Sequence, residues 1–442
     1  MKNKEILAAI NNKLQIETLN DMQQEVLDKS SSVGNSLILS PTGSGKTLAF
    51  AILILKSLKA KGNSGKVQSL VITPTRELTI QVHNILRAIA IDYKVTACYG
   101  GHSVMDETNS LSVTPDIIIS TPGRLMDHIN RGNIDIYTTS TLVLDEFDKS
   151  LELGFHVEMK QILKLMPNLS RRILTSATQL SMIPDFVKFE SYECFNYLSK
   201  NDNLRERLTI NQVESPENDK INPLVDLLKN IPTGLTIIFS NYRESAERIY
   251  NELLKYNLPV GVYHGGLEQK DREKFLAMFN NGTYKILSTT DLGARGLDIK
   301  QIENIIHYHI PTSQENYTHR NGRTARIDNN GNIYVITSPV DKIPEYMSFD
   351  NKVTLNPDAE MAFKIDTVTI YLSAGKKEKI SKGDIVGFLI KNSILESSDI
   401  GVIDIKDHYS LVALPSDKVN EALQNIEGKK IKNQRLRIGI TS

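Results

Sequence analysis

The chain has 442 residues and 40% hydrophobic content, a length that exceeds what one hydrophobic core usually supports, so two or three domains are expected. Its formal net charge is zero, so bulk charge does not attract polyanions, and any affinity for nucleic acid must come from local patches. Two cysteines are too few for a disulfide framework, and no apolar run approaches the roughly 18–20 residues that span a bilayer, so we expect a cytoplasmic protein without membrane contact.

Short β-branched segments alternate with longer amphipathic segments over the first two hundred residues. The pattern predicts buried strands at 36–40, 69–73, 116–120, 141–145 and 172–175, with helices between them. Such alternation is typical of a parallel sheet covered by helices on both faces, where the loops at the carboxyl ends of the strands form the site.

The same alternation restarts after a polar stretch at 201–222, which we interpret as a linker. It predicts strands at 235–240, 260–264, 285–289, 304–308 and 332–337, and helices at 243–255 and 269–279. The first two domains are therefore predicted at 1–200 and 223–345, each an α/β unit with a parallel sheet.

A smaller unit at 364–442 follows a second predicted linker at 346–363. Strands are predicted at 367–372, 400–405, 411–414 and 435–440, and helices at 383–391 and 418–425. This β-α-β-β-α-β order is typical of a small α+β domain of the RNA-recognition type.

A phosphate-binding motif, Ser-Pro-Thr-Gly-Ser-Gly-Lys-Thr, follows the first predicted strand. Its glycines let backbone N–H groups approach a triphosphate, Lys46 reaches the β- and γ-phosphates, and the Thr47 hydroxyl is free to bind Mg²⁺. We therefore predict an ATP site that contains Thr42, Gly43, Ser44, Gly45, Lys46 and Thr47.

Carboxylates follow the predicted strand that ends near residue 144, in the sequence Asp-Glu-Phe-Asp. A solvated loop would look similar, but together with the phosphate-binding motif the pattern predicts that Asp145 belongs to the Mg²⁺ shell and that Glu146 orients or deprotonates water. Ser176 and Thr178 end a later strand, where their hydroxyls are placed to couple the carboxylates to another lobe.

An arginine-rich motif, His-Arg-Asn-Gly-Arg-Thr-Ala-Arg, occupies residues 319–326. Arginines of such a motif suit delivery to the negative charge that develops during phosphoryl transfer. Together, the two motifs predict ATP hydrolysis that requires two lobes to close.

In their order, these motifs resemble those of the DEAD-box RNA helicases, over residues 1 to about 340. The matching positions are Gln23, 40–47, 74–78, 100–101, 121–124, 145–148, 176–178, 238–239, 264–265, 269–272, 290–298 and 319–326. The resemblance implies two tandem RecA-like domains and hydrolysis of ATP, with Mg²⁺, coupled to local unwinding of RNA.

The resemblance also implies a role for individual residues. Gln23 would hydrogen-bond the adenine and Asp298 would contact the ribose or phosphates, while Arg323 and Arg326 would act as arginine fingers. The two lobes would be coupled by Asp148, Ser176, Thr178 and His319. RNA phosphates would be held without base readout by Arg76, Gly101, Thr121, Gly123, Arg124, Gly265, Gln269, Arg272 and Thr290.

Two departures from the family pattern bear on function, beside a minor one at Ser40, where alanine is common. Phe147 stands where the family usually has alanine, so we expect a bulky ring near the lobe interface and altered coupling. The family usually has an aromatic residue upstream of its glutamine that stacks on adenine, and no aromatic residue precedes Gln23 in this chain. We therefore expect adenine preference to depend more heavily on the Gln23 amide.

Lysines cluster twice in the last unit, at 376, 377, 379 and 382 and again at 429, 430 and 432. Charge alone fits phosphate contacts and a merely solvated face equally well. Segments 377–387, 400–405 and 412–415 resemble the C-terminal RNA-binding domain of the bacterial DbpA group. That resemblance implies targeting to large-subunit ribosomal RNA and a role in ribosome assembly.

Three alternatives stay open at this point. Related tails also occur on cold-shock helicases, so a general RNA helicase or RNA chaperone without a single ribosomal target is possible. A DNA or DExH-type translocase is disfavoured by Gln23 and by the His-Arg opening of the arginine motif. A non-hydrolysing RNA clamp would require a broken site, whereas Lys46, Asp145 and Glu146 are all present.

Overall fold

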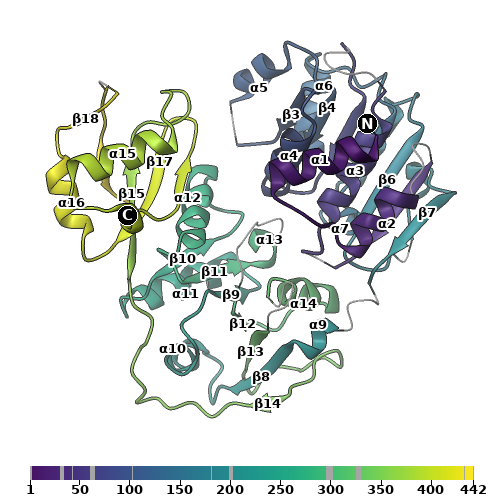
Figure 1. Ribbon diagram of the computed structural model, residues 1–442. Helices are drawn as coiled ribbons and strands as arrows, with labels where there is room; N and C mark the ends of the chain where they lie inside the picture. The colour runs from purple at the N-terminus through teal and green to yellow at the C-terminus, as the bar shows by residue number, and fades with distance from the viewer. Residues whose placement is uncertain are drawn as a thin grey trace. The chain divides into compact units, whose positions relative to one another are not determined.

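The computed structural model describes residues 2–29, 34–41, 43–59, 65–101, 103–180, 182–198, 203–294, 302–324, 330–432 and 434–441 (Figure 1). The chain divides into two compact units, with the division between Glu206 and Arg207. The first unit is called lobe 1 below. The second contains lobe 2, up to residue 363, and the C-terminal domain, 364–442.

Lobe 1 is built on a parallel seven-stranded sheet with the order β3-β4-β2-β5-β6-β1-β7. Its strands are β1 Asn35–Leu39, β2 Ser69–Ile72, β3 Val95–Cys98, β4 Ile117–Ser120, β5 Thr141–Leu144, β6 Arg171–Ser176 and β7 Tyr192–Asn196. Its helices are α1 Asn3–Leu14, α2 Asp21–Lys29, α3 Lys46–Ser57, α4 Arg76–Ile89, α5 Val104–Leu111, α6 Pro122–Asn130, α7 Phe147–Glu152, α8 His156–Lys164, the 3-10 turn η1 Asp185–Val187, and the short α9 Asn203–Glu206.

Two hydrophobic cores lie on the two faces of this sheet. Ile38 points into the core formed with α1 to α4, whereas its neighbours Leu37 and Leu39 point into the core formed with α6 and α8. The alternation follows from the pleat, which sends successive side chains to opposite faces. All five predicted strands are present, and the structure adds β3 and β7 at the two edges of the sheet.

Lobe 2 repeats the design with a parallel sheet in the order β10-β11-β9-β12-β13-β8-β14. Its strands are β8 Leu208–Glu214, β9 Thr236–Ser240, β10 Val260–Tyr263, β11 Ile286–Thr290, β12 Asn304–His307, β13 Gly331–Thr337 and β14 Asn351–Lys352. Its helices are α10 Ile221–Asn230, α11 Arg243–Leu254, α12 Gln269–Asn280, α13 Asp291–Ala294 and α14 Gln314–Asn321.

The two segments interpreted as linkers are structured in part. β8 lies inside the polar stretch 201–222 and pairs with β13 over its full length, so this part of the linker prediction is corrected. β14 lies inside 346–363 and pairs with β8, while Phe363 is buried against the core of lobe 2. β8 escaped prediction because polar residues interrupt its apolar pattern.

The C-terminal domain is an antiparallel sheet in the order β16-β17-β15-β20. Its elements are β15 Thr367–Leu372, α15 Lys382–Asn392, η3 Ser397–Asp399, β16 Ile403–Ile405, β17 Ser410–Pro415, α16 Val419–Ile426, the hairpin of β18 Lys430–Ile431 and β19 Gln434–Arg435, and β20 Ile438–Ile440. Both helices share one core with Ile370 and Leu372 of β15. The predicted β-α-β-β-α-β order is therefore confirmed, with the small hairpin as an addition.

The other face of this small sheet packs against lobe 2. Thr369, fully buried, accepts a hydrogen bond from Asn281 Nδ2 at 2.9 Å, and its hydroxyl lies 2.7 Å from that of Thr283. Burial first, and then the negative charge of Glu273 on α12, raise the pKa of Tyr409. Figure 1 shows α12 beside β15 and β17.

Across the described residues, no helix has the length and apolar content to cross a membrane.

Candidate functional site

The strand order of lobe 1 divides the carboxyl edge of its sheet into two halves. The phosphate-binding loop follows β1, the hydroxyl motif with Ser176 and Thr178 lies at the end of β6, and the carboxylate motif follows β5. These three strands are neighbours in the sheet. The loops predicted to contact RNA follow β3, β4 and β2, which form the other half. One edge thus carries a nucleotide half and an RNA half, side by side within the same lobe.

The phosphate-binding loop joins β1 to the N-terminus of α3. Gly43 and Gly45 adopt φ values of 81° and 85°, which favour glycine because they lie in the left-handed region. A Cβ on Gly45 would lie 2.3 Å from Gln23 Nε2. Lys46 is buried and its ammonium donates to the carbonyls of Ser40 and Pro41. The loop therefore places a lysine and a helix N-terminus together, which is a site for phosphate.

Gln23 is hydrogen-bonded to this loop. Its Nε2 atom donates to the Gly45 carbonyl at 3.2 Å, and its Oε1 atom accepts from the backbone N–H of Asn20 at 3.2 Å. Asn20 in turn donates to the Ser44 carbonyl at 2.9 Å. The structure thus brings Gln23 to the predicted nucleotide site. Asn20, which the sequence analysis did not name, is a second link between α2 and the loop.

Asp145 follows β5 and is 2% exposed. Its Oδ1 atom accepts from the Thr175 hydroxyl at 2.6 Å and from the Glu146 backbone N–H at 3.1 Å. Burial, followed by the neighbouring charge of Glu146, raises the pKa of Asp145 to about 7. Thr175 was not predicted. Its position directly before Ser176, at the end of β6, is the signal that would have indicated it.

Glu146 adopts a left-handed backbone conformation, with φ of 44°, which is strained for a residue with a side chain. Its backbone N–H donates to the Thr175 hydroxyl oxygen at 3.0 Å, so the same threonine fixes both carboxylate residues. Strain of this kind persists only where surrounding contacts hold it, and it is common at functional sites.

Asp148 is linked to the motif after β6 within lobe 1. Its Oδ2 atom accepts from the Thr178 hydroxyl at 3.0 Å, and Ser176 donates to the Thr178 carbonyl at 2.7 Å. The three coupling residues predicted for this lobe therefore form one hydrogen-bonded group, and the coupling role itself stays a prediction.

Phe147 packs inside lobe 1. The ring is fully buried in the lobe 1 core, in the same hydrophobic cluster as Leu125, Leu144 and Val187. The expectation of altered coupling between the lobes stays a prediction, because the packing of this ring within lobe 1 does not test it.

The residues present fit a magnesium ion. Asp145 Oδ2 is a buried oxygen without a hydrogen-bond partner among the described residues, so it retains an acceptor for a cation. A cation there would also offset the burial that raises the pKa of Asp145. Thr47 is the second residue of α3, directly after Lys46, so its position suits the predicted metal role.

The RNA half of lobe 1 is assembled from three helix and strand ends. Arg76 begins α4, whose N-cap Thr75 accepts from the Leu78 N–H at 3.2 Å. A Cβ on Gly100 would lie 3.1 Å from Arg76 Nη2, so the glycine allows the arginine to pack closely. Thr121 is the N-cap of α6, with Pro122 at its first position. The Arg124 guanidinium, 12% exposed, lies 3.4 Å from Glu107 Oε2.

In lobe 2, the predicted RNA residues follow β10 and β11, which are neighbours in the sheet. Gly265 is exposed after β10, and Gln269 and Arg272 lie on the first turn of α12. Thr290 ends β11 and accepts the Gly293 N–H at 3.3 Å. The four residues therefore come from one half of the sheet edge, as in lobe 1.

Arg320 on α14 is 1% exposed and organises the arginine motif. It donates two hydrogen bonds to the Asp291 carboxylate, one of them at 2.7 Å, and one to Asn241 Oδ1 at 2.7 Å. His319 and Arg323 are also buried. Burial and the Arg320 charge lower the pKa of His307 to about 3, so this ring stays neutral. The sequence pattern predicts no separate role for Arg320 within the motif.

Three predicted site residues, Thr42, Asp298 and Arg326, lie outside the described residues.

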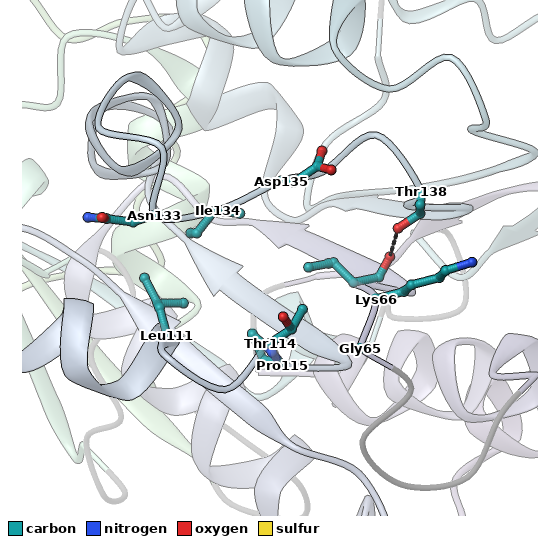
Figure 2. A pocket seen from close by; sticks show the side chains of 10 residues that line it. Gly65, Lys66, Leu111, Thr114, Pro115, Asn133, Ile134, Asp135 and Thr138 are labelled. Atoms are coloured by element: carbon teal, nitrogen blue, oxygen red, sulfur yellow. Dashed lines mark hydrogen bonds between the residues drawn. The ribbon is translucent and has the colours of Figure 1, made fainter.

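A small cavity of about 240 Å³ is unrelated to the motifs (Figure 2). Its lining residues include Lys66, Pro115 and Thr138, which precede strands, so it lies at the opposite edge of the lobe 1 sheet.

The two lysine clusters of the C-terminal domain meet in the structure. Lys432 donates to the Lys379 carbonyl at 3.0 Å and forms an ion pair with Asp384 at 2.7 Å. The hairpin thus lies against the N-terminus of α15. All seven lysines of the two clusters are exposed, and together they are called the lysine patch below.

Two parallel-sheet lobes, each with nucleotide-motif residues at the carboxyl edge of its sheet, define a tandem RecA-like nucleoside triphosphatase. Residues 20–185 match the DEAD/DEAH box helicase family, 219–328 the helicase conserved C-terminal domain and 369–440 the DbpA RNA-binding domain. The chain belongs to the DEAD-box ATP-dependent RNA helicases, enzymes that hydrolyse ATP.

Its relatives include the ATP-dependent RNA helicase DbpA of Bacillus subtilis (strain 168), 31% identical, with 94% of this chain and 93% of that protein covered. DbpA of Escherichia coli (strain K12) is 29% identical, with 97% and 95% covered. Among solved structures, Mss116p bound to single-stranded RNA and AMP-PNP aligns with a TM-score of 0.68 and 26% identity, over 76% of this chain and 72% of that one.

Proposed function

We propose that this helicase uses Mg²⁺ with ATP, that its C-terminal domain directs it to large-subunit ribosomal RNA, and that it acts in ribosome assembly in the cytoplasm. The single observation that carries the targeting is the lysine patch, which the fold assembles from two distant clusters on a domain of the DbpA type. The helicase core, by contrast, offers backbone groups and hydroxyls that contact phosphate without reading bases.

The proposed chemistry follows from the nucleotide half of lobe 1. Lys46 leaves the loop carbonyls to contact the phosphates, and Asp145 helps to hold the magnesium ion. That ion supplies charge stabilisation for phosphoryl transfer. Glu146 orients the attacking water, and the hydroxyl of Thr175 keeps the backbone of Glu146 in place. Arg323 and Arg326 of lobe 2 stabilise the developing charge when the lobes close, which makes hydrolysis dependent on RNA.

The catalytic assignment is tested with Glu146→Gln in the full chain. ATP binding is expected to persist while RNA-stimulated hydrolysis falls by at least about 100-fold, in the range that loss of one pre-organised catalytic group costs. RNA-stimulated hydrolysis near the wild-type rate would contradict the assignment.

The target is tested by steady-state ATPase without RNA, with poly(A) and with large-subunit ribosomal RNA fragments, at one stated salt concentration. Exchange of Lys382 and Lys430 for glutamine is expected to remove the preference for a ribosomal fragment and to spare stimulation by poly(A). The matched control exchanges Lys364 and Lys391, which are exposed lysines of the same domain outside the patch. Equal stimulation by every RNA in the wild type would instead indicate a general RNA helicase.

A further inference from the structure

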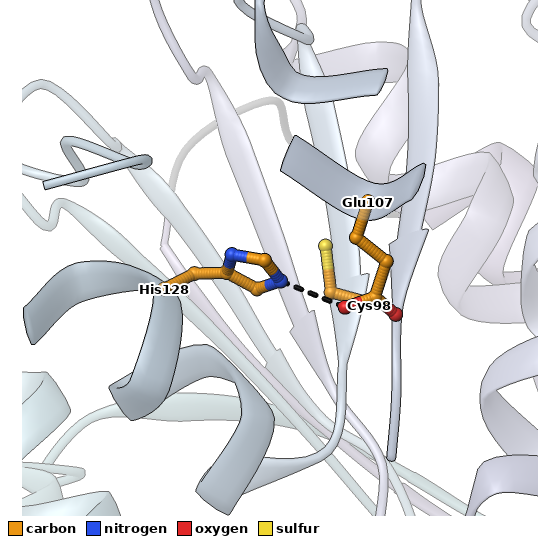
Figure 3. Close-up of side chains that lie close together, drawn as sticks. All are labelled: Cys98, Glu107 and His128. Carbon is orange, nitrogen blue, oxygen red and sulfur yellow. Dashed lines mark hydrogen bonds and ion pairs between the residues drawn. The ribbon is translucent and has the colours of Figure 1, made fainter. Parts of the chain in front are cut away.

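A buried cluster of Cys98, Glu107 and His128 lies beneath the RNA half of lobe 1 (Figure 3). Cys98 ends β3, Glu107 belongs to α5 and His128 to α6, and all three side chains are buried. Their potential ligand atoms lie within 4.8 Å of one another, as they would around a metal ion.

The hydrogen bonds of the cluster indicate that a proton, and not a metal ion, lies between His128 and Glu107. His128 Nδ1 accepts from the Asn133 side-chain amide at 3.0 Å, so the ring carries its proton on Nε2 and donates it to Glu107 Oε2 at 2.7 Å. Burial raises the pKa of Cys98 to about 12, so its thiol stays protonated. The guanidinium of Arg124, 3.4 Å from Glu107, already supplies a cation.

Glu107 connects two of the loops predicted to contact RNA. Its Oε1 atom accepts from the Tyr99 N–H at 2.8 Å, directly before the Gly100-Gly101 pair. Its Oε2 atom faces Arg124 at the start of α6. The third loop joins through Arg76, whose guanidinium packs on Gly100. One buried carboxylate therefore lies at the junction of the RNA half.

We propose that Glu107, held in place by His128, is a positioning residue for RNA binding. It fixes the Gly100-Gly101 loop relative to Arg124, so that the phosphate contacts of lobe 1 meet RNA at a set spacing. A largely buried guanidinium such as that of Arg124, 12% exposed, favours a nearby negative charge. Pre-organised loops also avoid an ordering cost when RNA binds. The proposal rests on the RNA contacts assigned to lobe 1 under the proposed function.

The first test is Glu107→Gln in the full chain, which keeps the shape and an acceptor for Tyr99 but removes the charge. The RNA concentration for half-maximal ATPase is expected to rise by about 10-fold, as lost pre-organisation predicts. ATP affinity measured without RNA is expected to stay within about twofold, because the nucleotide half lies on other strands. Cys98→Ala, which perturbs the same cluster without removing a charge, is the matched control and should leave the RNA dependence unchanged.

A double-mutant cycle with Arg124→Gln identifies the route of the effect. If Glu107 acts through Arg124, the double variant binds RNA no more weakly than Arg124→Gln, within about twofold. Additive losses, or RNA binding by Glu107→Gln equal to wild type while Arg124→Gln is impaired, would overturn this proposal alone. Unimpaired RNA binding by Arg124→Gln would instead refute the assigned RNA contact. Stoichiometric zinc in the purified wild type would overturn the hydrogen-bonded description of the cluster.

Discussion

The hydroxyl of Thr175 donates a 2.6 Å hydrogen bond to Oδ1 of Asp145, and its oxygen accepts the backbone N–H of Glu146. Thr175→Val keeps the shape and removes both bonds. We expect RNA-stimulated ATPase to fall by about 10-fold or more, since a hydrogen bond to a charged group contributes about 1.5–3 kcal/mol.

The control for that prediction is Thr139→Val. Thr139 is also fully buried in lobe 1, but its hydroxyl has no hydrogen-bond partner within the part of the chain that the structure describes. This variant should retain wild-type activity. Equal losses in the two variants would show that the Asp145 contact is not responsible.

Burial of Asp145 should also make stability depend on pH. Its pKa is about 7 in the folded chain and about 4 when unfolded, so the folded state binds the proton more tightly. The free energy of unfolding therefore falls as pH rises from about 4 to about 7. Asp145→Asn does not titrate, and without nucleotide it should gain about 1–3 kcal/mol relative to wild type between pH 5 and pH 8. Urea unfolding at pH 5 and pH 8 measures the difference in the free energy of unfolding between the variant and wild type. The same difference at both pH values would contradict the prediction.

The conformation of Gly45 should be essential for nucleotide binding. Gly45→Ala introduces strain at φ of 85° and brings a Cβ within 2.3 Å of Gln23 Nε2. ATP affinity should fall by at least about 100-fold, because the loop and Gln23 are both displaced. Gly132→Ala has a similar φ of 72°, but no atom of the residues that the structure describes lies within 4 Å of the added Cβ. It should lose only about 1 kcal/mol of stability and bind ATP normally.

Phe147 should matter for folding more than for coupling between lobes. Phe147→Ala, which creates the usual family residue, should lower the free energy of unfolding by about 3–5 kcal/mol through the cavity it leaves. Denaturant unfolding measures this loss, and Met182→Ala is the control because Met182 is 74% exposed. A fully stable Phe147→Ala variant with altered RNA-dependent ATPase would contradict this expectation and support a coupling role.

Arg320 should not tolerate lysine. Arg320→Lys keeps the charge but loses the paired hydrogen bonds to Asp291, and we expect about 2–4 kcal/mol lower stability of the second unit. Arg248→Lys provides the comparison, because the Arg248–Asp219 pair is about half exposed on both sides and contributes about 0–1 kcal/mol. Hydrogen exchange of lobe 2 amides would detect the difference, and similar protection in both variants would refute it.

Periodicity was sufficient to predict the central strands but not the strands with polar residues. The strand at Leu70 lies between strands on both sides, so its pattern is uniformly apolar and easily detected. β8 carries Asn211 and Gln212, and its pairing with β13 depends on residues more than one hundred positions away. Such strands are stabilised by a partner that the local pattern does not reveal.

Motifs likewise indicated the residues of the site but not the residues that hold them. The sequence indicates Asp145 and Gln23, because their surroundings repeat a family pattern. It does not indicate Thr175, Asn20 or Glu107, whose importance follows from the strand order and loop contacts that bring them to a motif. A hydrogen bond between distant segments has no periodic signal.

The contact of Thr369 with Asn281 and Thr283 has a consequence for the kinetics of the enzyme. A binding domain on a flexible tether presents its ligand to the helicase core at an effective concentration that depends on the length of the tether. Here the small sheet is docked on lobe 2, so RNA held by the C-terminal domain travels with that lobe. The effective concentration of RNA at the helicase core is then set by the geometry of a packed interface. Lengthening the segment before residue 364 should therefore change that concentration little.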